Sequence, residues 1–220
     1  MTIDHSLLDN RWFAQQPQAL RDAIIVHGRT VVLAEGQTAY LEGDEGTGLW
    51  FVTAGSMRLE MAVGPDRNVL IAIIRAGMMF GRTRAGGADA RIVSATADRP
   101  SRAFLLSDRA IARITADHVD MWRAMNEALL GQLDLTLKSL AILLLPPRAR
   151  VAARLQQMAQ HLSAQVRQSE LAELTGLSRK VVNGHLRALH HAGLIDQCYG
   201  AIRITDLAGL TRQAEGRETI

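Results

Sequence analysis

The sequence is poor in cysteine and has no long apolar run. Its 220 residues include a single cysteine, Cys198. One thiol forms no internal disulfide and cannot by itself hold a zinc ion or an iron–sulfur cluster, so a cluster-based sensor is excluded. The apolar run Leu140–Leu145 is far shorter than the roughly 20 residues of a membrane span, and Met1–Trp12 lacks the basic start and apolar core of a signal peptide. These absences predict a cytoplasmic protein.

Charge is unevenly distributed along a chain of globular composition. Residues 1–145 contain 15 Lys and Arg against 16 Asp and Glu, whereas residues 146–220 contain 10 against 6. A basic C-terminal part indicates a polyanionic partner there. The alternative is an ordinary solvated surface with a few extra arginines.

The first third of the chain is predicted to form short strands, after a helical lead-in at about Leu7–Ile25. The apolar runs predicted as strands are Val31–Leu33, Leu49–Thr53, Met57–Val63 and Val69–Ile74. Glycines separate these runs, and such close spacing of strand and turn signals predicts a small antiparallel barrel or roll. A metal enzyme on this barrel would need clustered histidine or carboxylate ligands. Gly28–Arg102 contains no histidine, so no enzyme is predicted.

A short helix at Ser107–Ile114 and a long one at about Asp117–Leu145 are predicted next. Five leucines recur along the long helix at spacings of three and four, which places them on one face. They are Leu130, Leu133, Leu137, Leu140 and Leu144. A second apolar set is expected to pack on the barrel, and it consists of Trp122, Met125 and Leu129. Two apolar faces need two partners, so the leucine face is interpreted as a dimer interface; the alternative is a helix that covers only its own barrel.

Pro146–Pro147 ends the long helix, because proline cannot continue the backbone hydrogen bonding, and is predicted to be the domain hinge. A further helix is predicted at about Arg148–Leu162. The segment that follows, Gln168–Leu186, has the pattern of two short helices joined by a sharp turn. Gly176 can adopt the positive φ that such a turn needs, and Ser178 can cap the second helix.

The second helix has an apolar face and a polar face. Val182, Leu186 and Leu189 recur at helical spacing, which leaves Arg179, Lys180 and Asn183 on the outer face. This is the layout of a helix-turn-helix whose second helix enters the DNA major groove; the alternative is an ordinary helical hairpin. Two β runs, Leu194–Asp196 and Ile202–Thr205, flank Tyr199–Gly200 and add a wing hairpin. The residues predicted to contact DNA are Ser169, Ser178, Arg179, Lys180 and Asn183.

Several stretches resemble the Crp/Fnr superfamily, the cyclic-AMP receptor protein and the fumarate–nitrate regulators. Leu41–Asp44 and Leu49–Val52 resemble the family's barrel signature, and Gly77–Gly81 resembles its entry to the ligand cassette. Stretches similar to its DNA-binding domain are Ser169–Ala172, Gly176–Arg179 and Leu189–Ile195. The resemblance covers nearly the whole chain.

The resemblance implies an α+β chain in three parts. These are an N-terminal antiparallel β-roll at 1–116, a dimerisation helix at 117–145, and a C-terminal winged helix-turn-helix at 146–220. It also implies a homodimeric regulator that binds palindromic operators in double-stranded DNA and has RNA polymerase as a partner. The alternative function is a sensor or adaptor that binds a small molecule or anion and has weakened DNA binding.

The ligand cassette departs from the pattern of the nucleotide-binding members. Their Phe-Gly is followed by a glutamate that holds the ribose, and here Phe80–Gly81 is followed by Arg82. The phosphate-binding arginine aligns with Arg91, whose neighbour Ile92 has no hydroxyl. Arginine cannot accept the ribose hydroxyl protons, so control by cyclic AMP is not expected and the effector is unknown.

Two interpretations of the cassette arginines stay open. Arg82, Arg84 and Arg91 either bind another anion or are solvated loop charges. Thr136 and Ser139 lie where cyclic-AMP-responsive relatives touch the base. The predicted ligand pocket therefore comprises Arg82, Arg91, Thr136 and Ser139.

The recognition helix also departs from the family pattern Ser-Arg-x-Thr-Val-x-Arg. Arg179 keeps the first arginine, whose fork suits guanine O6 and N7. Val181 replaces the threonine and Gly184 replaces the second arginine. The sequence therefore predicts one lost guanine contact and an operator that differs from those of relatives.

Overall fold

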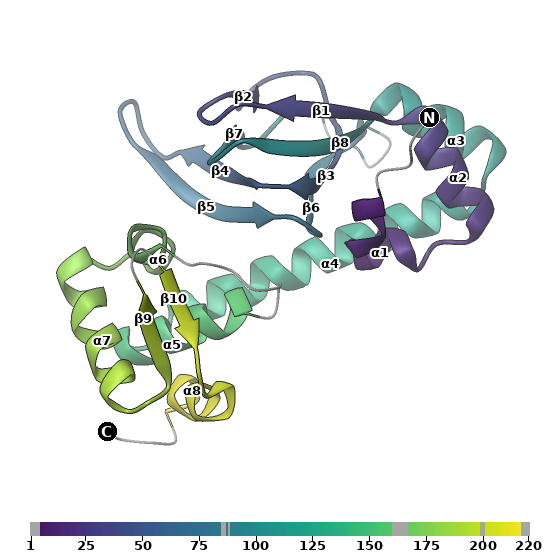
Figure 1. Ribbon diagram of the computed structural model, residues 1–220. Coiled ribbons are helices and arrows are strands. Elements are labelled where there is room, and N and C mark those ends of the chain that lie inside the picture. Colours follow the sequence, from purple (N-terminus) through teal and green to yellow (C-terminus); the bar gives the residue numbers. More distant parts are fainter. Residues whose placement is uncertain (1–4, 85–86, 88, 160–166, 199–200, 217–220) are drawn as a thin grey trace. The chain divides into compact units, whose positions relative to one another are not determined.

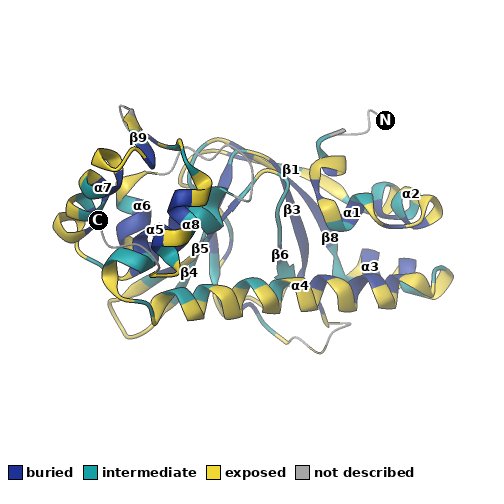
Figure 2. Ribbon diagram, turned by 90° about the horizontal axis from the view of Figure 1, so that it is seen from below, coloured by how far each residue is buried: buried dark blue, intermediate teal, exposed yellow. Residues whose placement is uncertain are grey.

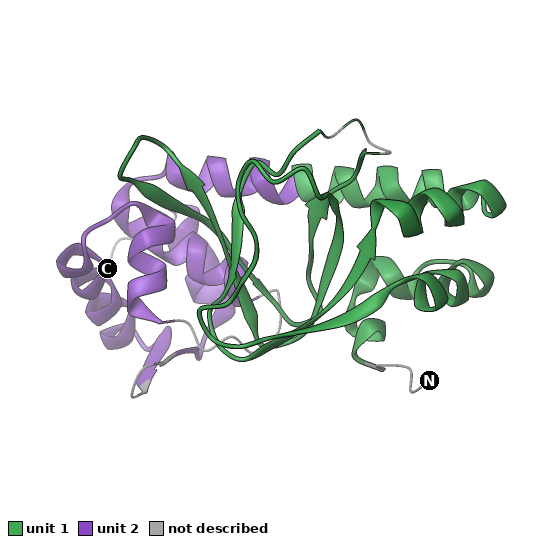
Figure 3. Cartoon of the chain, turned by 90° about the horizontal axis from the view of Figure 1, so that it is seen from above, with its two compact units in different colours: residues 1–133 green, residues 134–220 purple. Residues whose placement is uncertain are grey.

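The computed structural model describes residues 5–84, 87, 89–159, 167–198 and 201–216. The chain forms two compact units, Met1–Leu133 and Asp134–Ile220, which Figure 3 shows in green and purple. The boundary lies inside the long helix α4 (Asp120–Leu143), so the last ten residues of this helix belong to the C-terminal unit. The three-part division at residues 116 and 145 stays a prediction.

The first unit is built on two four-stranded antiparallel sheets (Figure 1). One sheet has the order β1-β8-β3-β6 and the other β2-β7-β4-β5. The strands are β1 (Arg29–Leu33), β2 (Thr38–Tyr40), β3 (Gly48–Ala54), β4 (Ser56–Ala62), β5 (Asn68–Arg75), β6 (Met79–Arg82), β7 (Ser94–Ala97) and β8 (Ser101–Ser107). The predicted antiparallel roll is confirmed.

Four of the eight strands were predicted from their apolar runs, and β2, β6, β7 and β8 were not. The strand β7 has the sequence SATA, whose small side chains give no apolar signal. It is nevertheless held on both sides, because β2 and β4 pair with it. Strand pairing therefore recruits segments that have little β preference of their own.

The N-terminal lead-in predicted over Leu7–Ile25 is helical, and it consists of three short elements. They are η1 (His5–Asp9), α1 (Arg11–Ala14) and α2 (Gln18–His27). Asn10 begins α1, because its side chain accepts a hydrogen bond from the Phe13 amide at 2.9 Å. Pro17 has an extended ψ of 147° and stands before α2, so one continuous helix cannot form.

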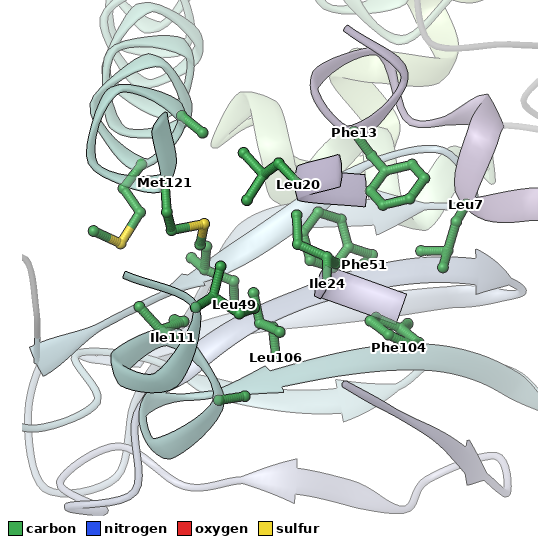
Figure 4. Packing of buried hydrophobic residues seen from close by; sticks show 14 residues of the cluster. Leu7, Phe13, Leu20, Ile24, Leu49, Phe51, Phe104, Leu106, Ile111 and Met121 are labelled. Carbon is green, nitrogen blue, oxygen red and sulfur yellow. The ribbon is translucent and has the colours of Figure 1, made fainter. Parts of the chain in front are cut away.

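A buried core joins these helices to the first sheet (Figure 4). Its largest fully buried side chains include Phe13, Leu20 and Ile24 from the helices and Phe51 and Leu106 from the strands. The helix α3 (Asp108–Asp117) adds Ile111 and Ile114 to the same cluster. It extends three residues beyond the predicted short helix.

The long helix contributes a narrower face to this core than the sequence predicted. Met121, Ala124, Met125 and Ala128 are its buried residues. Trp122 and Leu129 were expected to pack on the barrel and are instead 51% and 62% exposed. The alanine face is covered in part by α1, because Trp12 Nε1 donates to the Ala124 carbonyl at 2.6 Å, and Trp122 and Leu129 lie outside this face.

The second unit holds the remaining helices and a two-stranded sheet. They are α5 (Pro147–Ala159), α6 (Gln168–Thr175), α7 (Arg179–His191), β9 (Ile195–Cys198), β10 (Ala201–Ile204) and α8 (Leu207–Ala214). The part of α5 predicted beyond Ala159 lies outside the described residues. Its core is one cluster that includes Val151, Leu155, Leu171, Leu186 and Ile202. Within the described residues, no helix is long and apolar enough to cross a membrane.

Candidate nucleic-acid interface and ligand pocket

The turn between α6 and α7 has the predicted geometry. Gly176 adopts the left-handed conformation, with φ at +63°. The next amide, that of Leu177, donates to the carbonyl of Ala172 at 3.1 Å and closes the end of α6. A side chain at position 176 would be strained at this φ, which is why glycine is suited to this turn.

The second helix begins at the predicted cap. The Ser178 hydroxyl oxygen accepts a hydrogen bond from the Val181 amide at 3.3 Å. Val182, Leu186 and Leu189 are fully buried against the rest of the unit. Arg179 and Lys180 are exposed in the first turn of α7, as expected of residues that read a groove.

Two other predicted DNA residues are less accessible. Asn183 is half-buried, and its Oδ1 atom is buried without a hydrogen-bond partner among the described residues. Asn183 is thus less exposed than the outer-face position predicted for it, and its contact with DNA stays a prediction. Ser169 is half-buried near the start of α6. Gly184 is exposed, and an added Cβ would meet nothing within 4 Å.

Arg187 was not among the predicted contacts, although it is exposed on α7. It lies seven residues after Lys180, and this spacing places the two cations on one face of the helix. Helical spacing from Lys180 would have found it. The outer surface of α7 therefore carries three exposed cations, Arg179, Lys180 and Arg187.

The wing hairpin is present as β9 and β10, which pair from Ile195 with Ile204 to Cys198 with Ala201. Its predicted tip, Tyr199–Gly200, lies outside the described residues. His190 ties the end of α7 to this hairpin, because its Nδ1 lies 2.9 Å from the Ile195 carbonyl. The recognition helix and the wing are thus joined by a direct hydrogen bond.

Two family matches cover most of the chain. Residues 30–118 match the cyclic nucleotide-binding domain, and residues 149–213 match the Crp-like helix-turn-helix domain. Both matches coincide with the roll and the winged unit. The chain belongs to the Crp/Fnr family of transcription regulators.

Individual Crp/Fnr relatives agree over nearly the full length. The chain is 28% identical over 210 residues to a protein of Mycobacterium tuberculosis described as a CRP-like cAMP-activated global transcriptional regulator, a match that covers 90% of this chain and 93% of the relative. Among solved structures, TTHB099 of Thermus thermophilus, a CRP-family regulator, is 27% identical in sequence and superposes with a TM-score of 0.66. The match covers 84% of this chain and 96% of the TTHB099 chain. FixK2 of Bradyrhizobium japonicum has a TM-score of 0.75 at 17% identity, with coverage of 84% and 96%.

At the position of the Crp/Fnr phosphate-binding arginine, Arg91 is bound to the protein itself. It is 4% exposed, its Nε donates to the Gly46 carbonyl at 2.6 Å, and its Nη1 donates to the Gly48 carbonyl at 3.1 Å. The guanidinium carbon also lies 4.0 Å from the centre of the Tyr40 ring. Burial lowers the pKa of Arg91, while Tyr40, Asp108 and Asp44 act in the opposite direction. Arg91 therefore fixes the β2–β3 loop of this roll.

The ring beneath Arg91 belongs to an aromatic cluster inside the roll. Tyr40, Trp50 and Phe80 lie with their ring centres 6.1 Å apart in each pair. Desolvation raises the pKa of Tyr40 to about 12, against an opposing effect of Arg91. The Trp50 Nε1 is buried without a hydrogen-bond partner in the described residues.

The two other arginines of the cassette, Arg82 and Arg84, are more exposed than Arg91. Arg82 is half-buried at the end of β6, opposite Gly48 of β3. Arg84 is exposed, with its Nη2 3.5 Å from the Glu45 carbonyl. Its backbone amide donates to Asp108 Oδ1 at 2.9 Å, an oxygen that also accepts from the Thr83 hydroxyl at 2.8 Å. Asp108 therefore holds the end of the β6 segment to the start of α3.

Thr136 and Ser139 belong to the second unit, whereas Arg82 and Arg91 belong to the first. Thr136 is exposed. Ser139 is half-buried, and its hydroxyl oxygen accepts from Arg154 Nη1 at 3.2 Å and from Gln157 Nε2 at 3.1 Å. Within its unit, Ser139 is therefore engaged by α5.

Four of the predicted dimer leucines form an exposed row on α4, which Figure 2 shows as a largely yellow helix. The fifth, Leu144, lies in the turn that follows, because α4 ends at Leu143 and not at Leu145 as predicted. Leu130, Leu133, Leu137, Leu140 and Leu144 are all between 49% and 81% exposed in the single chain. Trp122 and Leu129 widen the exposed apolar surface of the same helix.

Proposed function

We propose that this Crp/Fnr regulator binds palindromic operators as a homodimer, with α7 of each subunit in the major groove. The observation that carries this proposal is the first turn of α7, where Ser178 fixes the start of the helix and leaves Arg179 and Lys180 exposed. A guanidinium at this place suits a bidentate contact with guanine. Regulation would follow from contact of the bound dimer with RNA polymerase.

Dimerisation is supported by the leucine row of α4. Four leucines exposed on a single helix, with a fifth just after it, are costly in water, and a second copy of the same helix can cover them. A twofold interface between identical helices relates the two recognition helices by the same axis. Such a dimer binds two half-sites about one helical turn apart, which accounts for a palindromic operator.

Control by cyclic AMP in the usual way is not part of this proposal. The Nε–Nη1 edge of Arg91 is occupied by the carbonyls of Gly46 and Gly48, so this edge is not free to bind a phosphate. Arg82 stands where a ribose-binding carboxylate is needed, and it has only donors. The Mycobacterium tuberculosis relative is described as cAMP-activated, so calorimetry on this chain is the direct test.

The test of DNA recognition is selection from a random DNA library at fixed salt, with wild type and Arg179→Ala compared. Loss of a bidentate arginine–guanine pair should cost about 1–3 kcal/mol per half-site and relax the preference at one symmetric base pair. The base pair that faces Gly184 should tolerate every substitution, since glycine has no side chain to contact it.

Arg109→Ala is the matched control, because Arg109 is an exposed arginine on α3 in the first unit. This variant should keep the wild-type motif. An Arg179→Ala motif that is unchanged and only uniformly weaker would identify Arg179 as a phosphate contact. A wild type that selects no DNA would favour the adaptor function.

A further inference from the structure

Two arginines of α5, one helical turn apart, join the C-terminal ends of two other helices. Arg150 donates through Nε and Nη2 to the Leu145 carbonyl, at 3.1 and 2.9 Å, and through Nη1 to the Thr175 carbonyl at 3.1 Å. Leu145 follows the end of α4 and Thr175 is the last residue of α6. The final carbonyls of a helix lack partners within it and carry partial negative charge, so a guanidinium is well suited to bind them.

Arg154 repeats this bridge deeper in the unit. Its Nη2 donates to the Leu174 carbonyl of α6 at 3.1 Å and approaches the Ser139 carbonyl of α4 at 3.5 Å. Its Nη1 donates to the Ser139 hydroxyl at 3.2 Å and to Gln157 Oε1 at 2.6 Å. The Gln157 amide donates in turn to the Ser139 hydroxyl at 3.1 Å, which closes a triangle of three side chains.

The buried positive charge of Arg154 is stabilised by neutral hydrogen-bond acceptors. The residue is 5% exposed, and no carboxylate lies within ion-pair distance of it in the described part of the chain. Burial accordingly lowers the pKa of Arg154. A buried cation without a counter-ion is expensive unless its donors are satisfied, and the Nε of Arg154 is already buried without a partner among the described residues. Its Nη1 and Nη2 bonds are therefore the ones that stabilise the charge, and displacement of Ser139 or Leu174 from them carries a large penalty.

These contacts link the two helices that matter for binding of a palindrome. Ser139 lies between Leu137 and Leu140 of the α4 leucine row, and Leu174 lies at the end of α6, directly before the turn to α7. Arg154 therefore connects the leucine row to the end of α6 at Ser139, beside the second connection that Arg150 makes between Leu145 and Thr175.

We propose that Arg154 is a positioning residue that locks α6 to α4 at Ser139, and thereby fixes the distance between the two recognition helices of the dimer. Ser139 acts in this lock as an acceptor for α5 rather than as a ligand contact. The inference rests on the homodimer proposed above.

The test measures how strictly the protein discriminates operator spacing. One inserted base pair at the centre of a palindrome moves one half-site by about 3.4 Å and rotates it by about 35°. The readout is the ratio of the DNA dissociation constants for the inserted and the native operator. It is measured for wild type, Arg154→Met, Ser139→Ala and Gln156→Leu, each checked for fold by circular dichroism and for dimerisation by light scattering.

Loosening the lock should lower this ratio. Arg154→Met should reduce it by about tenfold, the value that corresponds to the loss of a charged hydrogen bond. Ser139→Ala should reduce it by about threefold, since it removes one acceptor and favours the helix. Gln156→Leu is the matched control on α5, because its amide binds Thr211 of α8 at 3.0 Å and touches neither α4 nor α6, and the ratio should stay unchanged.

The outcomes separate this inference from the proposed function. A folded, dimeric Arg154→Met or Ser139→Ala variant that keeps the wild-type ratio overturns the lock. Should Arg154→Met fail to fold, Ser139→Ala decides alone, because its side chain is half-buried and alanine suits a helix. A monomeric wild type refutes the homodimer itself, whereas a dimeric wild type that is indifferent to spacing overturns the lock.

Discussion

Leu137→Glu tests the leucine row of α4 most directly. Leu137 lies in the middle of the row and is 54% exposed in the single chain. Complete burial of a leucine side chain contributes about 1.5–3 kcal/mol, so covering the exposed half contributes about 1 kcal/mol per subunit. A twofold interface contains the residue twice, and the substitution therefore removes about 2 kcal/mol of apolar burial.

The introduced carboxylate adds a second cost. It enters a surface formed mainly by leucines, and its desolvation there costs about 1 kcal/mol per subunit. The total of about 4 kcal/mol raises the dissociation constant of the dimer about 1000-fold. Sedimentation equilibrium at micromolar concentration should then report a monomer, with DNA binding weakened in parallel.

The control for this experiment is Leu41→Glu. Leu41 is also a leucine, it is 57% exposed, and it lies in the β2–β3 loop of the roll. The Leu41→Glu substitution should leave the dissociation constant of the dimer unchanged. If Leu137→Glu stays dimeric with the wild-type constant, the subunits associate through a surface other than this row.

Two further predictions concern the interior of the roll. Calorimetry should detect no micromolar binding of cyclic AMP, because Arg91 is held by the Gly46 and Gly48 carbonyls; micromolar binding would show that Arg91 leaves them. Burial raises the Tyr40 pKa from 10.0 to about 12, so folding keeps this phenol protonated. The associated stability, up to about 3 kcal/mol, is complete below pH 10 and is lost as the pH rises toward 12. Urea titrations across this range should show the loss in wild type and not in Tyr40→Phe; equal pH dependence would contradict the assigned burial.

Sequence alone predicted four strands from their apolar runs, and it missed both β8, which has such a run, and β7, which has none. The run Leu49–Thr53 is contained in β3, which is buried along most of its length. By contrast, β7 consists of small residues and exists because β2 and β4 supply its hydrogen-bond partners. Pairing between distant segments is not encoded in the local pattern, so such strands are found only in the folded chain.

The faces of α4 show the same limit. Periodicity located the leucine row, and all five leucines are exposed as expected of an uncovered interface in a single chain. It assigned Trp122 and Leu129 to the buried face, whereas Ala124 and Ala128 are the residues buried there. A pattern that ranks side chains by size and hydropathy selects the large ones for the buried face. Close packing of a helix against its neighbours selects small side chains for that face instead.

The sequence by itself determined the helix-turn-helix, because its physical requirements are local. Gly176 supplies the positive φ, Ser178 supplies the cap three residues before the amide it binds, and the apolar face repeats within one helix. Only the tertiary structure decided what the buried arginines do. Arg91 finds its carbonyls 45 and 43 residues away along the chain, and Arg154 binds carbonyls 15 and 20 residues away on two different helices. A guanidinium can bind either an external anion or a backbone carbonyl, and which of these it meets depends on segments that folding brings together.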